Sequence, residues 1–347
     1  MKILITGGAG FLGSNIVLKA LERGHTPVVM DNFVRKGSDN NAKILSEKHG
    51  VQIVHGETRI EDDWKQFKDI DAIVHLAGQP GIPKSMENPR LDFSVNAGGT
   101  LNALEHARSL GNIPVVYAST NKIYSDAING IPLVETETRY DLSNLSGLGY
   151  SQKGISEDFP MDSSGEHPHS PYGVSKATGD LLCQEWYHAF GVPTVVFRMS
   201  CIYGLFQNGV SEQGWTDFFI RQRILGDNKL IFYGNGKQVR DCLFGDDAAD
   251  AYITALEKIN IAKGKVFNLG GGKFNTSLIE WVNIMNEYDE EKGKMEISYA
   301  DWRLADHRLY ISDTTKIEKI LGWKATTDIR SGIERIVQAY KNNFYET

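Results

Sequence analysis

The sequence predicts an α/β fold in which a doubly wound parallel sheet is joined to a smaller C-terminal domain. Over the first two hundred residues, short runs rich in β-branched residues alternate with longer amphipathic segments, and this alternation is typical of βαβ units. The predicted helices of this half end beside glycines, which tolerate the left-handed backbone that closes a helix. After Arg198 the alternation is lost, and this change indicates a second domain.

Six strands of the parallel sheet are expected in chain order. They cover residues 2–6, 26–31, 51–55, 72–76, 114–119 and 193–198. Helices are expected at 10–23, 89–110 and 172–190, and the second half of the chain shows helical periodicity at 278–287 and 314–321. These elements assign 1–200 and about 241–268 to the first domain, and about 201–240 and 269–347 to the second.

One polar segment is too long to be an ordinary connection. It runs from Tyr124 to Pro171 and contains the runs S-N-L-S-G-L-G-Y and M-D-S-S-G-E-H-P-H. We interpret it as an active-site loop or lid, and a surface excursion without a role in the site is the alternative.

Composition excludes several classes of protein. Of the 347 residues, 41% are hydrophobic and 23% are charged, and no apolar run is long enough to cross a membrane, so we expect a protein without membrane contact. The N-terminus shows no signal peptide, which favours a cytoplasmic location. A net charge of −7 without a basic run argues against nucleic acid and favours a small-molecule partner.

The three cysteines carry no metal or disulfide pattern. Cys183, Cys201 and Cys242 are odd in number, widely spaced and outside any C-x-x-C motif. We expect them to be buried as small hydrophobic residues.

A glycine-rich turn follows the first predicted strand and opens the first helix. Its sequence is G-G-A-G-F-L-G, with Gly7, Gly10 and Gly13 at the spacing that lets a backbone approach a dinucleotide pyrophosphate. Such a turn alone is weak evidence, but Asp31 ends the next strand 18 residues after Gly13. Together they predict a Rossmann-type dinucleotide-binding domain, with the second domain binding the substrate.

The acid at the end of the second strand favours NAD over NADP. The Asp31 carboxylate can accept hydrogen bonds from ribose hydroxyls, whereas it repels a 2′-phosphate by roughly 1–4 kcal/mol at about 4 Å. Arg35 and Lys36 lie close behind it and can neutralise such a phosphate, so NADP stays open as an alternative.

A tyrosine and a lysine begin the helix at 172–190. Tyr172 and Lys176 are four residues apart, which places the phenol and the ammonium on one helix face. A phenol has a pKa near 10, and a neighbouring ammonium together with a cationic nicotinamide ring is expected to lower it far enough for general base catalysis. The same spacing at Tyr233 crosses a glycine-rich break, and at Tyr288 it lies in an acidic run, so neither fits.

Further contacts are expected at the carboxyl ends of the strands. Thr120 ends the fifth strand and can hydrogen-bond the reacting sugar hydroxyl, with a local cap as the alternative; Asn96 can supply a supporting amide or simply be solvated. The predicted cofactor contacts are Gly7, Gly10, Phe11, Leu12, Gly13, Asp31, Asn32, Arg35, Leu76, Ala77, Gly78, Gln79, Asn96, Ser119, Tyr172 and Lys176.

These motifs together resemble the extended short-chain dehydrogenases/reductases of the nucleotide-sugar epimerase/dehydratase type. The resemblance rests on G-G-A-G-F-L-G, Asp31, Ser119-Thr120 and Y-G-V-S-K and covers nearly the whole chain. Within that family, S-T-N-K-I-Y, H-S-P-Y-G-V-S-K, E-Q-G-W and G-N-G-K-Q-V-R-D are most similar to the CDP-paratose (CDP-tyvelose) 2-epimerase group. This resemblance implies a catalytic triad of Thr120, Tyr172 and Lys176, a tightly held NAD, a CDP-hexose substrate and a homodimer.

The residues after the catalytic threonine favour epimerisation over dehydration. The dehydratases of this family carry an Asp-Glu acid/base pair there, whereas this chain has Asn121 and Lys122. Epimerisation needs only hydride transfer out and back, so it fits without those carboxyl groups. The resemblance places the inverted centre at C2. A UDP-sugar 4-epimerase is the alternative among enzymes, and a non-catalytic NAD-binding sensor or scaffold is the alternative from another class.

Amides, an aromatic platform and guanidinium groups suit a nucleotide diphosphate. The predicted substrate contacts are Thr120, Asn121, Lys122, His169, Gln213, Trp215, Gln238, Arg240, Arg303 and Arg308, and for each arginine a surface ion pair is the alternative. His167 and His169 form an H-x-H that no acid or cysteine completes, so no metal is expected.

Overall fold

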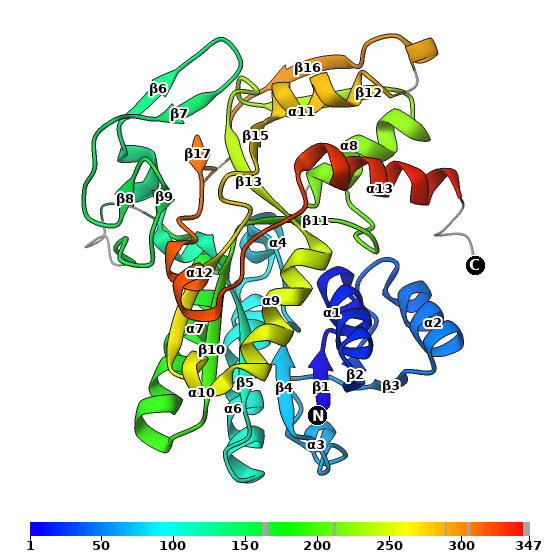
Figure 1. Ribbon diagram of the computed structural model, residues 1–347, viewed down its shortest axis with the longest axis vertical. Coiled ribbons are helices and arrows are strands. Elements are labelled where there is room, and N and C mark those ends of the chain that lie inside the picture. Colours follow the sequence, from blue (N-terminus) through cyan, green and yellow to red (C-terminus); the bar gives the residue numbers. More distant parts are fainter. Residues whose placement is uncertain (162–165, 167, 211–212, 289, 304–305, 343–347) are drawn as a thin grey trace.

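The computed structural model describes residues 1–161, 166, 168–210, 213–288, 290–303 and 306–342. Its central sheet has seven parallel strands in the order β14-β10-β5-β4-β1-β2-β3, which confirms the α/β class (Figure 1). The strands are β1 (Lys2–Thr6), β2 (Thr26–Asp31), β3 (Gln52–His55), β4 (Ala72–His75), β5 (Val115–Thr120), β10 (Thr194–Met199) and β14 (Lys265–Leu269).

The prediction of six strands was wrong, because it missed β14. This strand pairs in parallel with β10, with Phe197 opposite Phe267. Its apolar run is interrupted by Asn268, which is fully buried and donates through its amide to the Ile155 carbonyl. A polar residue with a tertiary partner therefore hid a buried strand from the hydrophobic pattern.

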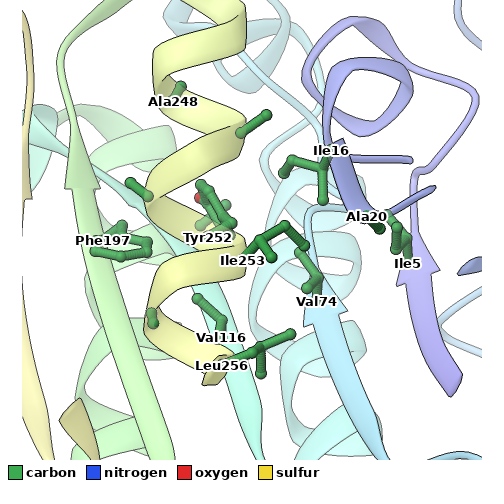
Figure 2. Packing of buried hydrophobic residues seen from close by; sticks show 14 of the residues in the cluster. Ile5, Ile16, Ala20, Val74, Val116, Phe197, Ala248, Tyr252, Ile253 and Leu256 are labelled. Atoms are coloured by element: carbon green, nitrogen blue, oxygen red, sulfur yellow. The ribbon is translucent and has the colours of Figure 1, made fainter. Parts of the chain in front are cut away.

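Helices cover both faces of the sheet, so its strands are apolar on both sides. On one face, α1 (Phe11–Glu22) and α9 (Gly245–Glu257) pack against the sheet, and Figure 2 shows Tyr252 and Ile253 of α9 lying between Phe197 and Val74. On the other face lie α6 (Gly99–Ser109) and α7 (Ser170–Phe190). The other α-helices around the central sheet are α2 (Ser38–His49), α3 (Glu61–Trp64), α4 (Ile82–Glu87), α5 (Pro89–Phe93) and α10 (Ile259–Ala262).

The predicted helix at 89–110 is three joined segments. A π-helical turn over Ser94–Gly98 separates α5 from α6. The predicted helices at 10–23 and 172–190 are confirmed as α1 and α7, and α7 ends at Gly191, whose φ is 74°.

A second group of elements lies beyond the carboxyl ends of the central strands (Figure 1). Two small sheets are formed by β11 (Cys201–Tyr203), β13 (Val239–Phe244), β15 (Asn275–Ser277) and β17 (Leu309–Tyr310), and by β12 (Lys229–Tyr233) with β16 (Glu296–Ala300). The helices are α8 (Trp215–Ile224), α11 (Leu278–Met285), α12 (Thr315–Leu321) and α13 (Ile329–Lys341), of which α11 and α12 confirm the two helices expected here. The helices α8, α11 and α13 share a core around the buried Trp281, whereas α12 packs on β14 and belongs to the core of the central sheet. The domain boundaries near 201, 241 and 269 stay a prediction.

The long polar segment is folded. It forms the hairpins β6 (Leu133–Glu135) with β7 (Tyr140–Leu142) and β8 (Tyr150–Ser151) with β9 (Gly154–Ile155), beside β17 (Figure 1). Its apolar residues build a small core of their own, in which Tyr124 stacks on Tyr310 with ring centroids 6.4 Å apart. None of the helices in the described ranges combines the length and apolar character that a bilayer crossing requires.

Candidate active site

The glycine-rich turn connects β1 to α1 in a space where side chains do not fit. A Cβ on Gly7 would lie 2.9 Å from the Ala77 nitrogen, and a Cβ on Gly13 would lie 2.3 Å from the Gly7 oxygen. Gly10 is the N-cap of α1 and supplies no side-chain acceptor, so the first N–H groups of the helix are available to an anion. This cradle fits a dinucleotide pyrophosphate, and Phe11 and Leu12 lie in its helical part.

Asp31 is buried at the end of β2 and ties two loops together. Its Oδ2 accepts from the Ala9 nitrogen at 3.1 Å and its Oδ1 accepts from the Phe33 nitrogen at 2.9 Å. Burial raises the pKa of Asp31, and the backbone donors act against that rise. A carboxylate has about four lone-pair positions, so acceptor capacity remains for two ribose hydroxyls.

Two predicted cofactor contacts beside Asp31 have protein partners. The Asn32 amide donates to Glu57 at 3.0 Å. The Arg35 guanidinium donates to the Gln213 side-chain oxygen at 2.6 Å and thereby joins the cofactor side to the substrate side. Burial lowers the pKa of Arg35.

The loop after β4 is held by the amide of Asn96. The Asn96 oxygen accepts from the Gln79 nitrogen at 2.9 Å, and its nitrogen donates to the Gln79 oxygen at 3.1 Å. A Cβ on Gly78 would lie 2.9 Å from the same Asn96 oxygen. Asn96 thus positions the loop formed by Leu76, Ala77, Gly78 and Gln79.

Thr120, Tyr172 and Lys176 meet between β5 and α7. Burial raises the pKa of Tyr172 to about 12, and a hydrogen bond with the Thr120 hydroxyl acts against that rise. The Lys176 ammonium lies 4.3 Å from the centre of the Tyr117 ring, and burial lowers its pKa to about 8. In the chain by itself, burial and the Asp92 charge therefore raise the pKa of Tyr172, and the lowering expected with the nicotinamide ring in place stays a prediction.

Ser119 points away from these groups. Its hydroxyl donates to Asp180 at 2.7 Å, and Asp180 forms a buried ion pair with Arg198 at 3.0 Å. It braces β5 against α7, and its predicted contact with the cofactor stays a prediction.

A cavity of about 600 Å³ opens next to Thr120 and Tyr172. It brings together eight of the ten predicted substrate contacts: Thr120, Asn121, Lys122, Gln213, Trp215, Gln238, Arg240 and Arg303. The other two are not among its lining residues. The His169 ring bonds the Met161 carbonyl at 2.5 Å, and Arg308 is exposed. His167 lies outside the described residues.

The cavity also corrects the interpretation of the long polar segment. None of its described residues lines the cavity, so this part of the segment is a packed excursion and not a lid; positions 162–165 and 167 of the M-D-S-S-G-E-H-P-H run lie outside the described residues. Its hairpins contact the second group of elements instead, since the Tyr140 nitrogen donates to the Lys237 carbonyl at 3.0 Å.

Charged groups face one another across the cavity. Burial lowers the pKa of Lys122 to about 8, with the Asp306 charge acting against it. Burial alone would raise the pKa of Asp306, but Arg240 and Lys122 outweigh it and hold that pKa below its ordinary value. Arg240 donates to Asp306, and Arg303 lies 3.9 Å from the centre of the Tyr233 ring. The side-chain oxygen of the buried Gln238 has no hydrogen-bond partner among the described residues, so it can accept from a ligand.

Several lining residues were not predicted. They are Pro80, Gly81, Ile82, Pro83, Met86, Ser200, Cys201, Gly214, Phe219, Ile231, Tyr233, Leu278 and Asp306. The P-G-I-P run directly after the fourth strand was the available signal for the first four, because it continues the carboxyl edge of the sheet. Position was also a signal for Gly214, which lies between Gln213 and Trp215, and for Ser200 and Cys201, which follow the sixth predicted strand. The remaining lining residues are apolar or sequentially isolated and carry no local pattern.

The fold and the site define an enzyme that uses a nicotinamide dinucleotide to transform an alcohol in an adjoining cavity. The model of the NAD dependent epimerase/dehydratase family matches residues 3–270, and the chain belongs to that family. Its cofactor is NAD, which is also present in solved relatives. Family membership also sets aside the non-catalytic alternative.

Individual relatives extend over the whole chain. A CDP-paratose 2-epimerase from Salmonella typhi is 36% identical over 97% of this chain and 98% of the relative. A putative UDP-glucose 4-epimerase from Methanocaldococcus jannaschii is 32% identical over 98% and 99%. The structure of UDP-glucuronic acid 4-epimerase from Bacillus cereus, with UDP-glucuronic acid and NAD, has a TM-score of 0.81 at 25% identity and covers 99% of this chain and 100% of that one. The relatives share nucleotide sugars as substrates.

Proposed function

We propose that this protein is an NAD-dependent epimerase that inverts C2 of the hexose in a CDP-sugar. The observation that carries the choice of epimerisation is the pair of side chains after Thr120. Asn121 and Lys122 line the cavity there, and neither is a carboxylic acid that could drive elimination of water. The cavity carboxylate of Asp306 is held ionised by Arg240 and Lys122, so it is a poor proton donor.

The nucleotide base and the sugar of the substrate are proposed from similarity to the relatives. The Salmonella relative is a CDP-sugar 2-epimerase and is 36% identical, four points above the putative UDP-glucose 4-epimerase. The partnerless Gln238 oxygen in the cavity wall suits a ligand that offers a hydroxyl or an amino group.

The chemistry follows from the positions of the catalytic side chains. When bound, NAD accepts the hydride that leaves the alcohol carbon and returns it in the second half of the reaction. Tyr172 takes the hydroxyl proton as that carbon becomes a ketone, while Thr120 holds the hydroxyl oxygen and the Lys176 charge favours the phenolate. After the keto-sugar turns over, hydride adds to its opposite face and Tyr172 gives back the proton. No net oxidant is consumed.

The proposal is tested by giving the purified protein CDP-glucose and UDP-glucose in parallel and following the configurations at C2 and C4 by NMR. Inversion at C2 of the CDP-sugar is expected. Inversion only at C4 of the UDP-sugar would instead favour the 4-epimerase alternative.

The role of Tyr172 is tested by Tyr172→Phe, with Tyr288→Phe as the control because Tyr288 has the same Tyr-x-x-x-Lys spacing outside the cavity. Loss of the Tyr172 general base is expected to lower kcat by about 10²–10⁴-fold in Tyr172→Phe, and Tyr288→Phe should keep the native kcat. Turnover by Tyr172→Phe at the native rate would refute the mechanism.

A further inference from the structure

Two cysteines that are far apart in the sequence are neighbours in the structure. Cys201 in β11 pairs directly with Cys242 in β13, and the two strands are parallel. Neighbouring strands lie about 4.8 Å apart and paired side chains share one face, which brings the Cα atoms within the range that a disulfide spans. The two thiols also interact as side chains.

The pair is asymmetric with respect to the cavity. Cys201 lines the substrate cavity and is partly exposed, whereas Cys242 is fully buried behind it. Burial, and after it the neighbouring Cys201 thiol, raises the pKa of Cys242 well above its ordinary value. The third cysteine, Cys183, is fully buried in the separate core between the central sheet and α7. A reagent that enters the cavity therefore reaches Cys201 first.

The cavity favours anionic reagents. Lys122, Arg240 and Arg303 line it, and Asp306 is the acid among the described lining residues. A small anionic disulfide such as glutathione disulfide is attracted to this cationic surface, as a nucleotide diphosphate would be.

We propose that Cys201 and Cys242 form a dithiol modification site that takes small anionic disulfides from the substrate cavity. The Cys201 thiolate attacks one sulfur of glutathione disulfide, forms a protein–glutathione mixed disulfide and releases one glutathione thiolate. Cys242 gives its proton to the glutathione thiolate released in the first step and attacks the Cys201 sulfur, so that the protein disulfide forms and the second glutathione leaves as a thiolate. Two protein thiols are oxidised and one glutathione disulfide is reduced to two thiols.

The expectation that all three cysteines are buried is wrong for Cys201, which is only partly buried because it lies at the cavity wall. While the mixed disulfide is present, glutathione occupies the space of the substrate, so modification and substrate binding exclude one another. Cys242 ends the blocked form because it lies directly opposite Cys201, and its raised pKa makes this second step the slower one. Oxidation of the two thiols is independent of the preferred sugar and base, whereas competition with CDP rests on the proposed function.

The experiment treats the purified full chain with glutathione disulfide and reads intact mass and peptide maps. Wild type is expected to lose two hydrogens, with Cys201 and Cys242 joined and Cys183 free. Cys242→Ser is expected to stop with one glutathionyl group on Cys201, and Cys201→Ser is expected to stay unmodified at Cys242. Added CDP should slow the reaction in proportion to its occupancy, and cystamine, a cationic disulfide, should react more slowly.

Three results would overturn the proposal. They are a wild-type protein that keeps three free thiols, modification of Cys183 at the same rate as Cys201, and oxidation of Cys242 at the native rate in Cys201→Ser. The wild-type maps decide the first two without any variant, and circular dichroism checks that the serine variants are folded. Dithiothreitol is expected to restore both thiols.

Discussion

Lys176 packs on an aromatic face and forms no ion pair within the described part of the chain, although the Asp180 and Asp92 charges act on it from a distance. Its ammonium lies 4.3 Å from the Tyr117 ring centre, and the Tyr117 ring stacks on buried His75 with centroids 5.9 Å apart. An ion pair would cancel part of the charge that acts on Tyr172, whereas an aromatic quadrupole attracts the ammonium and leaves its charge intact. Gly179 makes this arrangement possible, since a Cβ there would lie 2.3 Å from the Tyr117 hydroxyl.

The buried lysine is expected to cost stability at neutral pH. Its pKa falls from 10.5 to about 8 on folding, so below pH 8 the folded state carries the full cost of burying the charge. Lys176→Met should raise the free energy of unfolding at pH 7 by up to roughly 3 kcal/mol while abolishing activity. Between about pH 8 and 10.5 the unfolded wild type binds more protons, so its stability rises with pH and the advantage of the variant shrinks.

Urea unfolding at pH 7 and pH 10 measures both effects. Lys68→Met, at an exposed lysine, is the control and should change little at either pH. An advantage of Lys176→Met that grows with pH would contradict the assignment.

Replacing Tyr117, whose ring contacts the Lys176 ammonium, should weaken catalysis. A desolvated cation–π contact contributes about 2 kcal/mol, so Tyr117→Leu is expected to lower kcat roughly 30-fold and to move the titration of Lys176 to lower pH. Tyr117→Phe keeps the ring and should retain most of the activity. Equal losses in the two variants, seen in pH–rate profiles of protein that circular dichroism shows to be folded, would assign the effect to the hydroxyl.

At this scale the sequence predicted residues whose role depends on local spacing. Tyr172 and Lys176 share a helix face, and Thr120 and Asp31 end strands, so their positions follow from the elements that carry them. The sequence did not predict the environment that determines their chemistry. Tyr117 and Asp306 act through contacts between distant segments, and no local pattern marks such contacts.

Among the elements, the β1–α1 turn is the part most constrained by geometry. A Cβ on Gly13 would lie 2.3 Å from the Gly7 oxygen and 2.5 Å from the Gly8 Cα, and backbone cannot yield as a side chain would. Gly13→Ala is therefore expected to displace α1 from β1 and to abolish NAD binding, measured by titration calorimetry.

Gly24→Ala is the matched control for that turn. Gly24 follows the same helix with a φ of 73°, but a Cβ there meets nothing within 4 Å. It should cost only about 1 kcal/mol of stability through its left-handed backbone and leave NAD affinity unchanged. Similar loss of NAD binding in both variants would show that general destabilisation, and not the cradle, is responsible.

Elements with a clear hydrophobic period were predictable, and elements that depend on tertiary partners were not. The helices α1 and α7 follow from apolar faces and terminal glycines, whereas β14 contains buried Asn268 and the four strands of the two hairpins are only two or three residues long. Such short strands are stabilised by packing on β17 and its neighbours, which periodicity within one segment does not report.

On the scale of the whole molecule, three neighbouring helices carry exposed apolar side chains. Phe93 in α5, Leu101 in α6 and Val174 and Leu181 in α7 are 38–55% exposed. The homodimer that the family resemblance implies stays a prediction, and this surface is where we expect it to form. Leu181→Glu should convert a dimeric mass to a monomeric one in light scattering.

Ile261→Glu is the control for that surface, since Ile261 is 50% exposed on α10, outside these helices. It should leave the mass unchanged. A monomeric wild type would refute the dimer outright.

The path of the chain between the two groups of elements has a consequence for biosynthesis. The chain leaves the central sheet after β10, builds β11, β12 and β13, and only then returns to add β14 to the open edge of β10. On the ribosome, β10 therefore exposes an unpaired edge until residue 269 has emerged, and the walls of the cavity are incomplete for longer still, because Leu278, Arg303 and Asp306 follow. The cavity therefore cannot be completed before residue 306 has been made, and we expect a nascent chain in this interval to expose surface that favours aggregation.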